Sequence, residues 1–143
     1  MNNKGRVLAL DIGTVRIGAA ISDPSQIIAQ GLGVWKVEND EWLKDFEECL
    51  NKYNPALIVV GLPVRTDGKK SEAAENIVTL IDTLRKKYPD QNFVTHDERF
   101  TTVIAQRALI EANVSRKNRR KTVDKLAAVL ILESWLESKS NIH

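Results

Sequence analysis

The stretch VLALDIGTVRIGAAISD, residues 7–23, contains two apolar runs that are joined by a short polar connection. We expect residues 6–12 and residues 17–22 to form two antiparallel strands, because a connection this short suits an antiparallel pair. Asp11 interrupts the first apolar run. An ionised carboxylate in apolar surroundings is costly unless it is paired or coordinates a metal. The stretch therefore predicts a sheet whose first strand carries a functional acid.

The rest of the chain alternates between strand-like and helix-like patterns. A third strand is expected over residues 27–37, where Gly31 and Gly33 weaken the pattern or mark a bulge. The continuous β-branched run at 56–63 is typical of a strand that is covered on both faces. The other expected elements are a helix at 39–53, a helix capped by Ser71, a strand at 92–98, and helices at 101–113 and 122–138. This order predicts an α/β fold with a five-stranded mixed sheet, three antiparallel strands followed by two parallel ones, flanked by helices.

Length and composition limit the class of protein. With 143 residues, 43% of them hydrophobic and 28% charged, the chain suits one soluble globular domain over residues 1–143 and not a disordered protein. The single cysteine, Cys49, is expected to be a small core residue. The spacing of Trp35, Trp42 and Trp135 favours core packing over base stacking. No apolar run suits a signal peptide or a membrane span, which predicts a cytoplasmic protein with no membrane partner.

Positive charge is concentrated in one segment. The net charge is +2, but the segment from Arg99 to Lys125 carries eight basic and two acidic residues, which gives +6 there and leaves −4 in the remainder. A localised positive patch is typical of nucleic-acid binding, although a solvated helix face gives the same pattern. Arginine and lysine bind backbone phosphates. The candidates for such contacts are Arg16, Arg65, Arg99, Arg116, Lys117, Arg119, Arg120 and Lys121.

Three acids stand where a carboxylate is unexpected: Asp11 in the first strand, Glu98 at the end of the last strand, and Asp124 at the start of the last helix. If the first and last strands are neighbours, the three carboxylates converge. Because they repel one another, such a cluster needs a cation, and Mg²⁺ or Mn²⁺ suits oxygen ligands. Taken singly, Asp124 also fits a helix-dipole role, and Glu98 a surface pair with Arg99. Asp97 should point to the face opposite Glu98.

Four motifs occur in order along the chain: LALDIGTVRIGAAISD, LIVVGLP, HDERFTT and VDKLAAVLILESWL. Together they resemble the YqgF (RuvX) family, Holliday-junction-resolvase-like proteins of the RNase H-like superfamily, over residues 6–137. The resemblance implies an RNase H-like fold and a metal-dependent nuclease that processes the 5′ end of pre-16S ribosomal RNA. By motif, Asp11, Glu98 and Asp124 match the acidic triad of that family. Arg65 lies in the loop after GLP, where the sequence departs from the family pattern.

The implied reaction is hydrolysis of a phosphodiester bond with two divalent ions, Mg²⁺ or Mn²⁺, for which Asp11 would be the bridging ligand. The expected partner is nucleic acid, structured RNA in preference to a DNA junction, within a pre-ribosomal particle. We expect a monomer or a weak homodimer. Two alternatives stay open. One is a resolvase of four-way DNA junctions, which needs a dimer with two sites; the other is a nucleic-acid-binding module of transcription or ribosome assembly that does not cut.

Overall fold

The computed structural model describes residues 4–63, 71–98 and 119–140, and of residues 119–124 and 140 it describes the helical backbone alone. Its strands form one sheet in the order β3-β2-β1-β4-β5. They are β1 (Val7–Ile12), β2 (Arg16–Ser22), β3 (Ala29–Lys36), β4 (Leu57–Leu62) and β5 (Phe93–Asp97). The pairs β1–β2 and β2–β3 are antiparallel, whereas β1–β4 and β4–β5 are parallel. The predicted five-stranded mixed sheet is confirmed.

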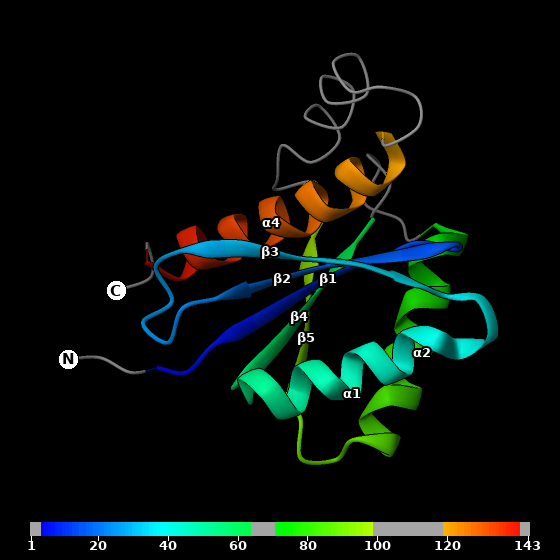
Figure 1. Ribbon diagram of the computed structural model, residues 1–143, viewed down its shortest axis with the longest axis horizontal. Coiled ribbons are helices and arrows are strands. Elements are labelled where there is room, and N and C mark those ends of the chain that lie inside the picture. Colours follow the sequence, from blue (N-terminus) through cyan, green and yellow to red (C-terminus); the bar gives the residue numbers. More distant parts are fainter. Residues whose placement is uncertain (1–3, 64–70, 99–118, 141–143) are drawn as a thin grey trace.

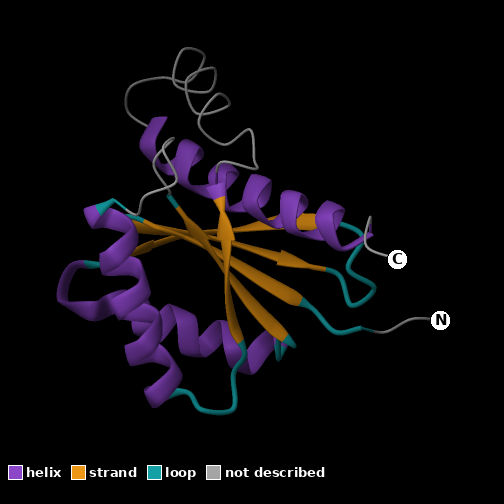
Figure 2. Ribbon diagram, turned by 180° about the vertical axis from the view of Figure 1, so that it is seen from behind, coloured by secondary structure: helices purple, strands orange, loops and turns teal. Residues whose placement is uncertain are grey.

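Helices cover both faces of this sheet, as Figures 1 and 2 show. On one face lie α1 (Glu41–Tyr53), which follows the short 3₁₀ turn η1 (Glu38–Asp40), and α2 (Glu72–Lys87). On the other face α4 (Arg119–Ser140) packs mainly over β1, β2 and β3. Ser71 caps α2 as predicted: its hydroxyl oxygen accepts a hydrogen bond from the backbone N–H of Ala74. The helix expected at 101–113 lies outside the described residues.

Alternation along each strand divides the core between the two faces. Leu8 and Leu10 of β1 pack with the buried residues of α1 and α2, among them Phe46. Val7 and Ala9, which alternate with these two leucines along β1, pack with the buried residues of α4. The position of a residue along a strand therefore tells which face its side chain occupies.

Aromatic side chains fill the core between the sheet, α1 and α2. Phe46 is at the centre, with its ring centroid between 5.3 and 6.5 Å from those of four other rings, namely Trp35, Trp42, Tyr88 and Phe93. Cys49 lies nearby in the same core, and its burial raises the pKa of the thiol to about 11. The core positions predicted for Trp35, Trp42 and Cys49 are thus confirmed.

The third strand begins at Ala29, two residues later than the sequence predicts. The carboxylate of Asp23 accepts hydrogen bonds from the backbone N–H groups of Ile27 and Ile28, both at 2.7 Å. These donors are therefore held in the turn after β2 and do not enter the sheet. Both isoleucine side chains are exposed.

The bulge predicted at the glycines of β3 is present. Ala19 pairs with Gly33 but Ala20 pairs with Gly31, so the register shifts between them. Gly33 has a φ of 155°, a conformation that favours glycine. A Cβ at Gly31 would lie 2.6 Å from Cε of Lys125, so glycine at this position leaves room for a side chain of α4.

Replacing Asp23 by alanine is expected to lower the thermal unfolding midpoint at pH 7, and the difference from wild type should shrink below about pH 4. The N–H groups of Ile28 and Ile27 hold the pKa of Asp23 below its usual value. A carboxyl whose pKa is lower in the folded state contributes stability above its unfolded pKa, and this contribution is lost as the pH falls through the folded pKa. Thermal scans from pH 7 to pH 2 measure the effect.

Asp82→Ala is the matched control, because Asp82 forms an exposed ion pair with Arg85 at 3.5 Å, and a pair of this kind contributes little to stability. Its unfolding midpoint should stay close to that of wild type throughout. A difference for Asp23→Ala that is the same at pH 7 and pH 2 would contradict the role given to the ionised carboxylate.

The last helix begins at Arg119, whereas the sequence predicts a start at residue 122. Arginine and lysine are good helix formers, so the basic residues before Asp124 continue the helix. Asp124 consequently lies inside α4 and does not open it. Among the described helices, α4 included, none is long and apolar enough to cross a membrane.

The first and last strands, β1 and β5, are not neighbours in the sheet. The sequence predicts convergence of the three acids on the condition that they are, and that condition is not met. β4 lies between β1 and β5. Each parallel crossover adds the next strand at the outer edge of the sheet: β4 beside β1, then β5 beside β4. No short sequence motif predicts this order. Any meeting of Asp11 and Glu98 must therefore take place across β4.

Candidate nuclease site

Asp11 lies near the carboxyl end of β1, between two glycines. It pairs with Gly18 of β2, and the register between β1 and β4 brings it level with Gly61 on the other side. Alternation places Asp11 on the same face as Ala9, the face that α4 covers. A glycine therefore stands level with Asp11 in each of the two neighbouring strands, and Asp11 itself is half-buried.

Glu98 approaches Gly61 from the other side of β4. It follows β5 directly and is 6% exposed. Its Oε1 oxygen lies 3.3 Å from the point that a Cβ at Gly61 would occupy, and Cδ1 of Ile131 lies 2.5 Å from the same point. Asp11 and Glu98 thus come from the strands on either side of Gly61, which must lack a side chain for Glu98 and Ile131 to lie where they do.

Asp124 belongs to the helix that covers this face. It precedes Ala127 by three residues and Ala128 by four, and both alanines are fully buried against the sheet. Residues at this spacing share one face of a helix. Figures 1 and 2 show α4 crossing this face of the sheet, and beyond Asp124 along the helix Ile131 lies beside Gly61 of β4 and Ser134 beside His96 of β5. The Asp124 side chain itself is not described.

Asp11 and Glu98 therefore lie on the face of the sheet that α4 covers, and Asp124 belongs to that helix; the convergence of the three carboxylates stays a prediction. Among the described side chains, which do not include that of Asp124, no three His, Cys, Asp or Glu residues form a group that could hold a metal ion. Two carboxylates, Asp11 and Glu98, are placed beside the same glycine. Their oxygens are hard donors of the kind that Mg²⁺ and Mn²⁺ prefer.

A family model described as "RuvX: Holliday junction resolvase" matches residues 5–138 of the chain. The chain belongs to the RuvX family. A relative named "Putative pre-16S rRNA nuclease", from Thermoanaerobacter pseudethanolicus, is 41% identical over 140 residues and is matched over 95% of this chain and 99% of its own length. A protein of the same name from Clostridium tetani is 40% identical over 139 residues, with the same coverage.

Solved structures share the fold of this RuvX protein at much lower identity. The structure of T. thermophilus RuvC in complex with Holliday junction substrate gives a TM-score of 0.54 at 12% identity, over 95% of this chain and 96% of that one. The yeast mitochondrial Holliday junction resolvase Ydc2 gives a TM-score of 0.53 at 13% identity, over 98% and 81% of the two chains. These likenesses support the RNase H-like fold that the motifs imply.

His96 of β5 contacts α4 through two side chains of that helix. Its Nε2 atom lies 2.8 Å from Oγ of Ser134, and its ring meets that of Trp135 edge-on at 5.9 Å. Burial lowers the pKa of His96, an effect that the charge of Asp97 opposes. Trp135 accordingly packs in the structure and does not offer a free ring for base stacking. Asp97 pairs with Leu62 of β4, and Leu62 packs in the core between the sheet, α1 and α2. The Asp97 side chain therefore lies on that face, opposite Glu98, as predicted.

Of the eight basic residues expected to contact phosphate, Arg16 is the one whose side chain the structure describes. It begins β2, is half-buried, and lines a shallow hollow with Lys36 and Glu38. The backbone of α4 starts with three others, Arg119, Arg120 and Lys121, one turn before Asp124. The remaining four lie outside the described residues: Arg65, Arg99, Arg116 and Lys117.

Gly61 is the site position that the sequence reasoning missed. It stands within the β-branched run at 56–63, where the pattern predicts only a buried strand. The available signal was the glycine itself, because glycine inside a strand often marks the close approach of another group. In this RuvX protein that approach is made by Glu98 and Ile131.

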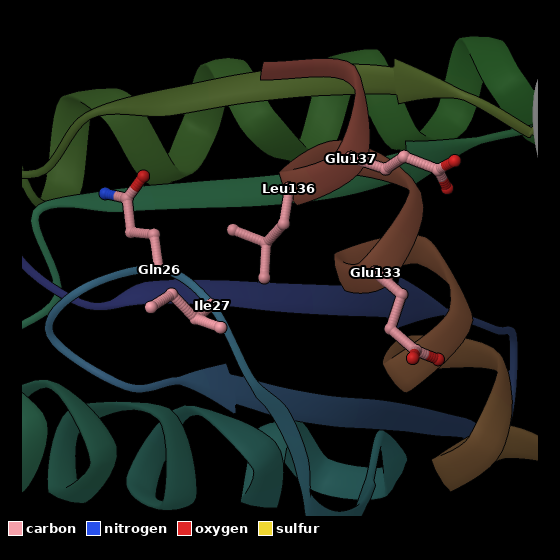
Figure 3. Close-up of a pocket in the computed structure, with 5 residues that line it drawn as sticks. All are labelled: Gln26, Ile27, Glu133, Leu136 and Glu137. Atoms are coloured by element: carbon pink, nitrogen blue, oxygen red, sulfur yellow. The ribbon is translucent and has the colours of Figure 1, made fainter. Parts of the chain in front are cut away.

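A hollow of about 410 Å³ at the C-terminal end of α4 is a poor alternative site for nucleic acid. Figure 3 shows Gln26 and Ile27 on one side of it and three residues of α4 on the other, Glu133, Leu136 and Glu137. Two carboxylates repel a phosphate backbone, and the described part of this rim offers no cation. The edge of the sheet near Asp11 is the better candidate.

Proposed function

We propose that the chain is a metal-dependent nuclease that hydrolyses a phosphodiester bond in the 5′ region of pre-16S ribosomal RNA. The observation that carries this proposal is the placement of Asp11 and Glu98 on one face of the sheet, on either side of Gly61. The names of relatives that are about 40% identical over nearly the whole chain support the choice of substrate. Processing of ribosomal RNA also implies a cytoplasmic protein and a pre-ribosomal partner.

The residues at this edge fit a divalent cation. Asp11 and Glu98 supply carboxylate oxygens, and the lack of a side chain at Gly61 lets the Glu98 carboxylate approach β4 on this face. Asp124, on the helix over this face, is the proposed third ligand. Mg²⁺ or Mn²⁺ bound by these acids would supply a water of lowered pKa and a counter-charge for the developing phosphate oxygens. We propose Asp11 as the bridging ligand, because it is the central acid of the sheet.

The other contribution of the chain is to hold the phosphate backbone. Three basic residues begin α4 one turn before Asp124, so cations precede the acid on the same helix. Arg16 stands at the start of β2, five residues after Asp11. Arginine binds phosphate in a bidentate fashion, and such contacts position a strand without reading its sequence. We therefore propose that these residues orient RNA toward the acids.

Incubation of two end-labelled substrates, a transcript of the pre-16S 5′ region and a synthetic four-way DNA junction, tests the proposal. Each is incubated with Mg²⁺, with Mn²⁺ or with EDTA. We expect cleavage of the RNA with either metal and none with EDTA. Binding measured in EDTA should weaken steeply between 50 and 200 mM salt, because counterions are released from the RNA.

A resolvase is the second candidate, favoured by the description of the family and by the RuvC-like fold. Cleavage of the junction alone would establish it, and a dimer in sedimentation at the same concentration should accompany that result, since symmetric cleavage needs two sites. If neither substrate is cut but binding is retained, the nuclease proposal is wrong and a non-cutting binding module is the correct interpretation.

A further inference from the structure

A pocket of about 440 Å³ opens at the carboxyl edge of the sheet, on the face opposite α4. Its walls are apolar side chains from the end of β1, from β2 and from both helices of that face, including Ile12, Ile17, Trp42 and Ile77. A well-formed apolar pocket with a few polar groups is the usual form of a small-ligand site. Neither the proposed metal ligands nor the proposed phosphate contacts are among the residues that line this pocket.

The pocket adjoins the proposed nuclease site through the chain itself. Ile12, a wall residue of the pocket, follows Asp11 directly in β1. Consecutive residues of a strand point to opposite faces, with Cα atoms about 3.8 Å apart. The acids and the pocket thus occupy the two faces of the same edge. A nucleic-acid strand that passes this edge with a phosphate at the acids would have a neighbouring base within reach of the pocket.

The polar groups at the mouth favour a neutral ring over a phosphate. Asp40 at the mouth carries a carboxylate that repels phosphate, while Asn76 of α2 offers both a hydrogen-bond donor and an acceptor. Thr14, in the turn after β1, adds a hydroxyl. Apolar walls with an amide at the rim suit a flat heteroaromatic ring that has hydrogen-bonding edges, and single-stranded RNA is recognised through unstacked bases of this kind.

We propose that this pocket receives an unstacked nucleobase of the strand whose phosphate lies at Asp11 and Glu98. The proposal rests on the proposed function for the position of the phosphate, and it adds that the enzyme requires an unpaired base beside the scissile bond. Fully paired RNA should therefore be a poor substrate, because its bases are held in the stack.

Ala73 provides the means to test this, because it lines the pocket from an exposed position in the first turn of α2. Ala73→Leu fills the mouth without altering the packed core. Thr79→Leu places a leucine at an exposed position of α2 that is not part of the pocket. Both substitutions are made in wild type and in an Asp11→Asn background, where the strand stays intact, and circular dichroism and thermal unfolding check that each variant is folded.

Binding is measured with a set of single-stranded RNA oligonucleotides, each lacking the base at a different single position. One such abasic position should weaken binding to the Asp11→Asn protein about tenfold, since a bound base contributes that much in comparable sites. Ala73→Leu should weaken binding of the intact oligonucleotide by a similar factor and be insensitive to that abasic position. Thr79→Leu should behave as its parent does.

Equal binding of intact and abasic oligonucleotides by the parent protein would overturn the proposal, and so would an Ala73→Leu effect that is the same for both. These results are separable from the fate of the proposed function. Metal-dependent cleavage by wild type that Ala73→Leu leaves unchanged would keep the nuclease and remove the base pocket. Base-dependent binding without any cleavage would keep the pocket and remove the nuclease.

Discussion

The Asp11→Asn variant is expected to cut RNA about a thousandfold more slowly than wild type, a loss of roughly 4 kcal/mol in transition-state stabilisation. Asparagine keeps the shape of the side chain but removes its charge, which the proposed metal ligand needs. Because the shape is kept, the half-buried position should stay packed, and the variant should still show a cooperative unfolding transition.

Single-turnover cleavage with Mg²⁺ measures the rate, and a thermal scan of the same preparation measures stability. Asp97→Asn is the matched control, since Asp97 precedes Glu98 in sequence but faces the opposite core. It should retain cleavage within a fewfold of wild type. If Asp11→Asn and Asp97→Asn lower the rate equally, or if Asp11→Asn loses its activity only because it unfolds, then Asp11 is not a catalytic ligand.

Those parts of the fold that depend on local pattern were predictable. The apolar runs on both sides of Asp11 predict β1 and β2, and the short connection between them predicts that they are antiparallel. The cap of α2 at Ser71 follows from the hydroxyl and the helical spacing after it. In each case the residues that decide the structure are close together in the chain.

The order of the strands was not predictable in this way. β4 is separated from β1 by more than 40 residues, and its place between β1 and β5 is decided by packing across the sheet and not by any short motif. The start of β3 was misplaced for a different reason. The apolar residues Ile27 and Ile28 look like strand residues, but a side chain earlier in the chain, Asp23, binds their N–H groups. A local hydrogen bond of this kind competes with the sheet ladder.

The candidate site also has a part that local sequence predicts and a part that depends on the assembled sheet. Acid positions could be chosen from the sequence because Asp11 conflicts with its apolar neighbours and Glu98 ends a strand. The glycines that flank Asp11, Gly18 and Gly61, are aligned with it only by the register of β1 with its two partners. Register is a property of the assembled sheet, so the importance of these glycines becomes visible once the pairs are known.

The Gly61→Ala variant is expected to lose both stability and activity, and the two losses can be separated. The added Cβ would lie 2.5 Å from Cδ1 of Ile131 and 3.3 Å from Oε1 of Glu98. Forcing an extra carbon into a packed core costs about 1–3 kcal/mol in free energy of unfolding, here through the contact with Ile131. The contact at 3.3 Å requires the Glu98 carboxylate to move by a few tenths of an ångström, so cleavage should fall severalfold, since a shift of about 1 Å in a reacting group can cost about a hundredfold.

Ile131→Val, which removes the Cδ1 atom, distinguishes the two effects. In the double variant Gly61→Ala/Ile131→Val the contact with Cδ1 is absent, so denaturant unfolding should show most of the stability of Ile131→Val alone. The contact with Oε1 of Glu98 is unchanged in the double variant, so cleavage should stay near the low rate of Gly61→Ala. Recovery of both stability and cleavage would instead mean that Gly61 serves the packing of α4 alone. If the double variant is fully stable and still cuts slowly, no packing defect is left to explain the loss of cleavage. Gly61 then acts by positioning the Glu98 carboxylate.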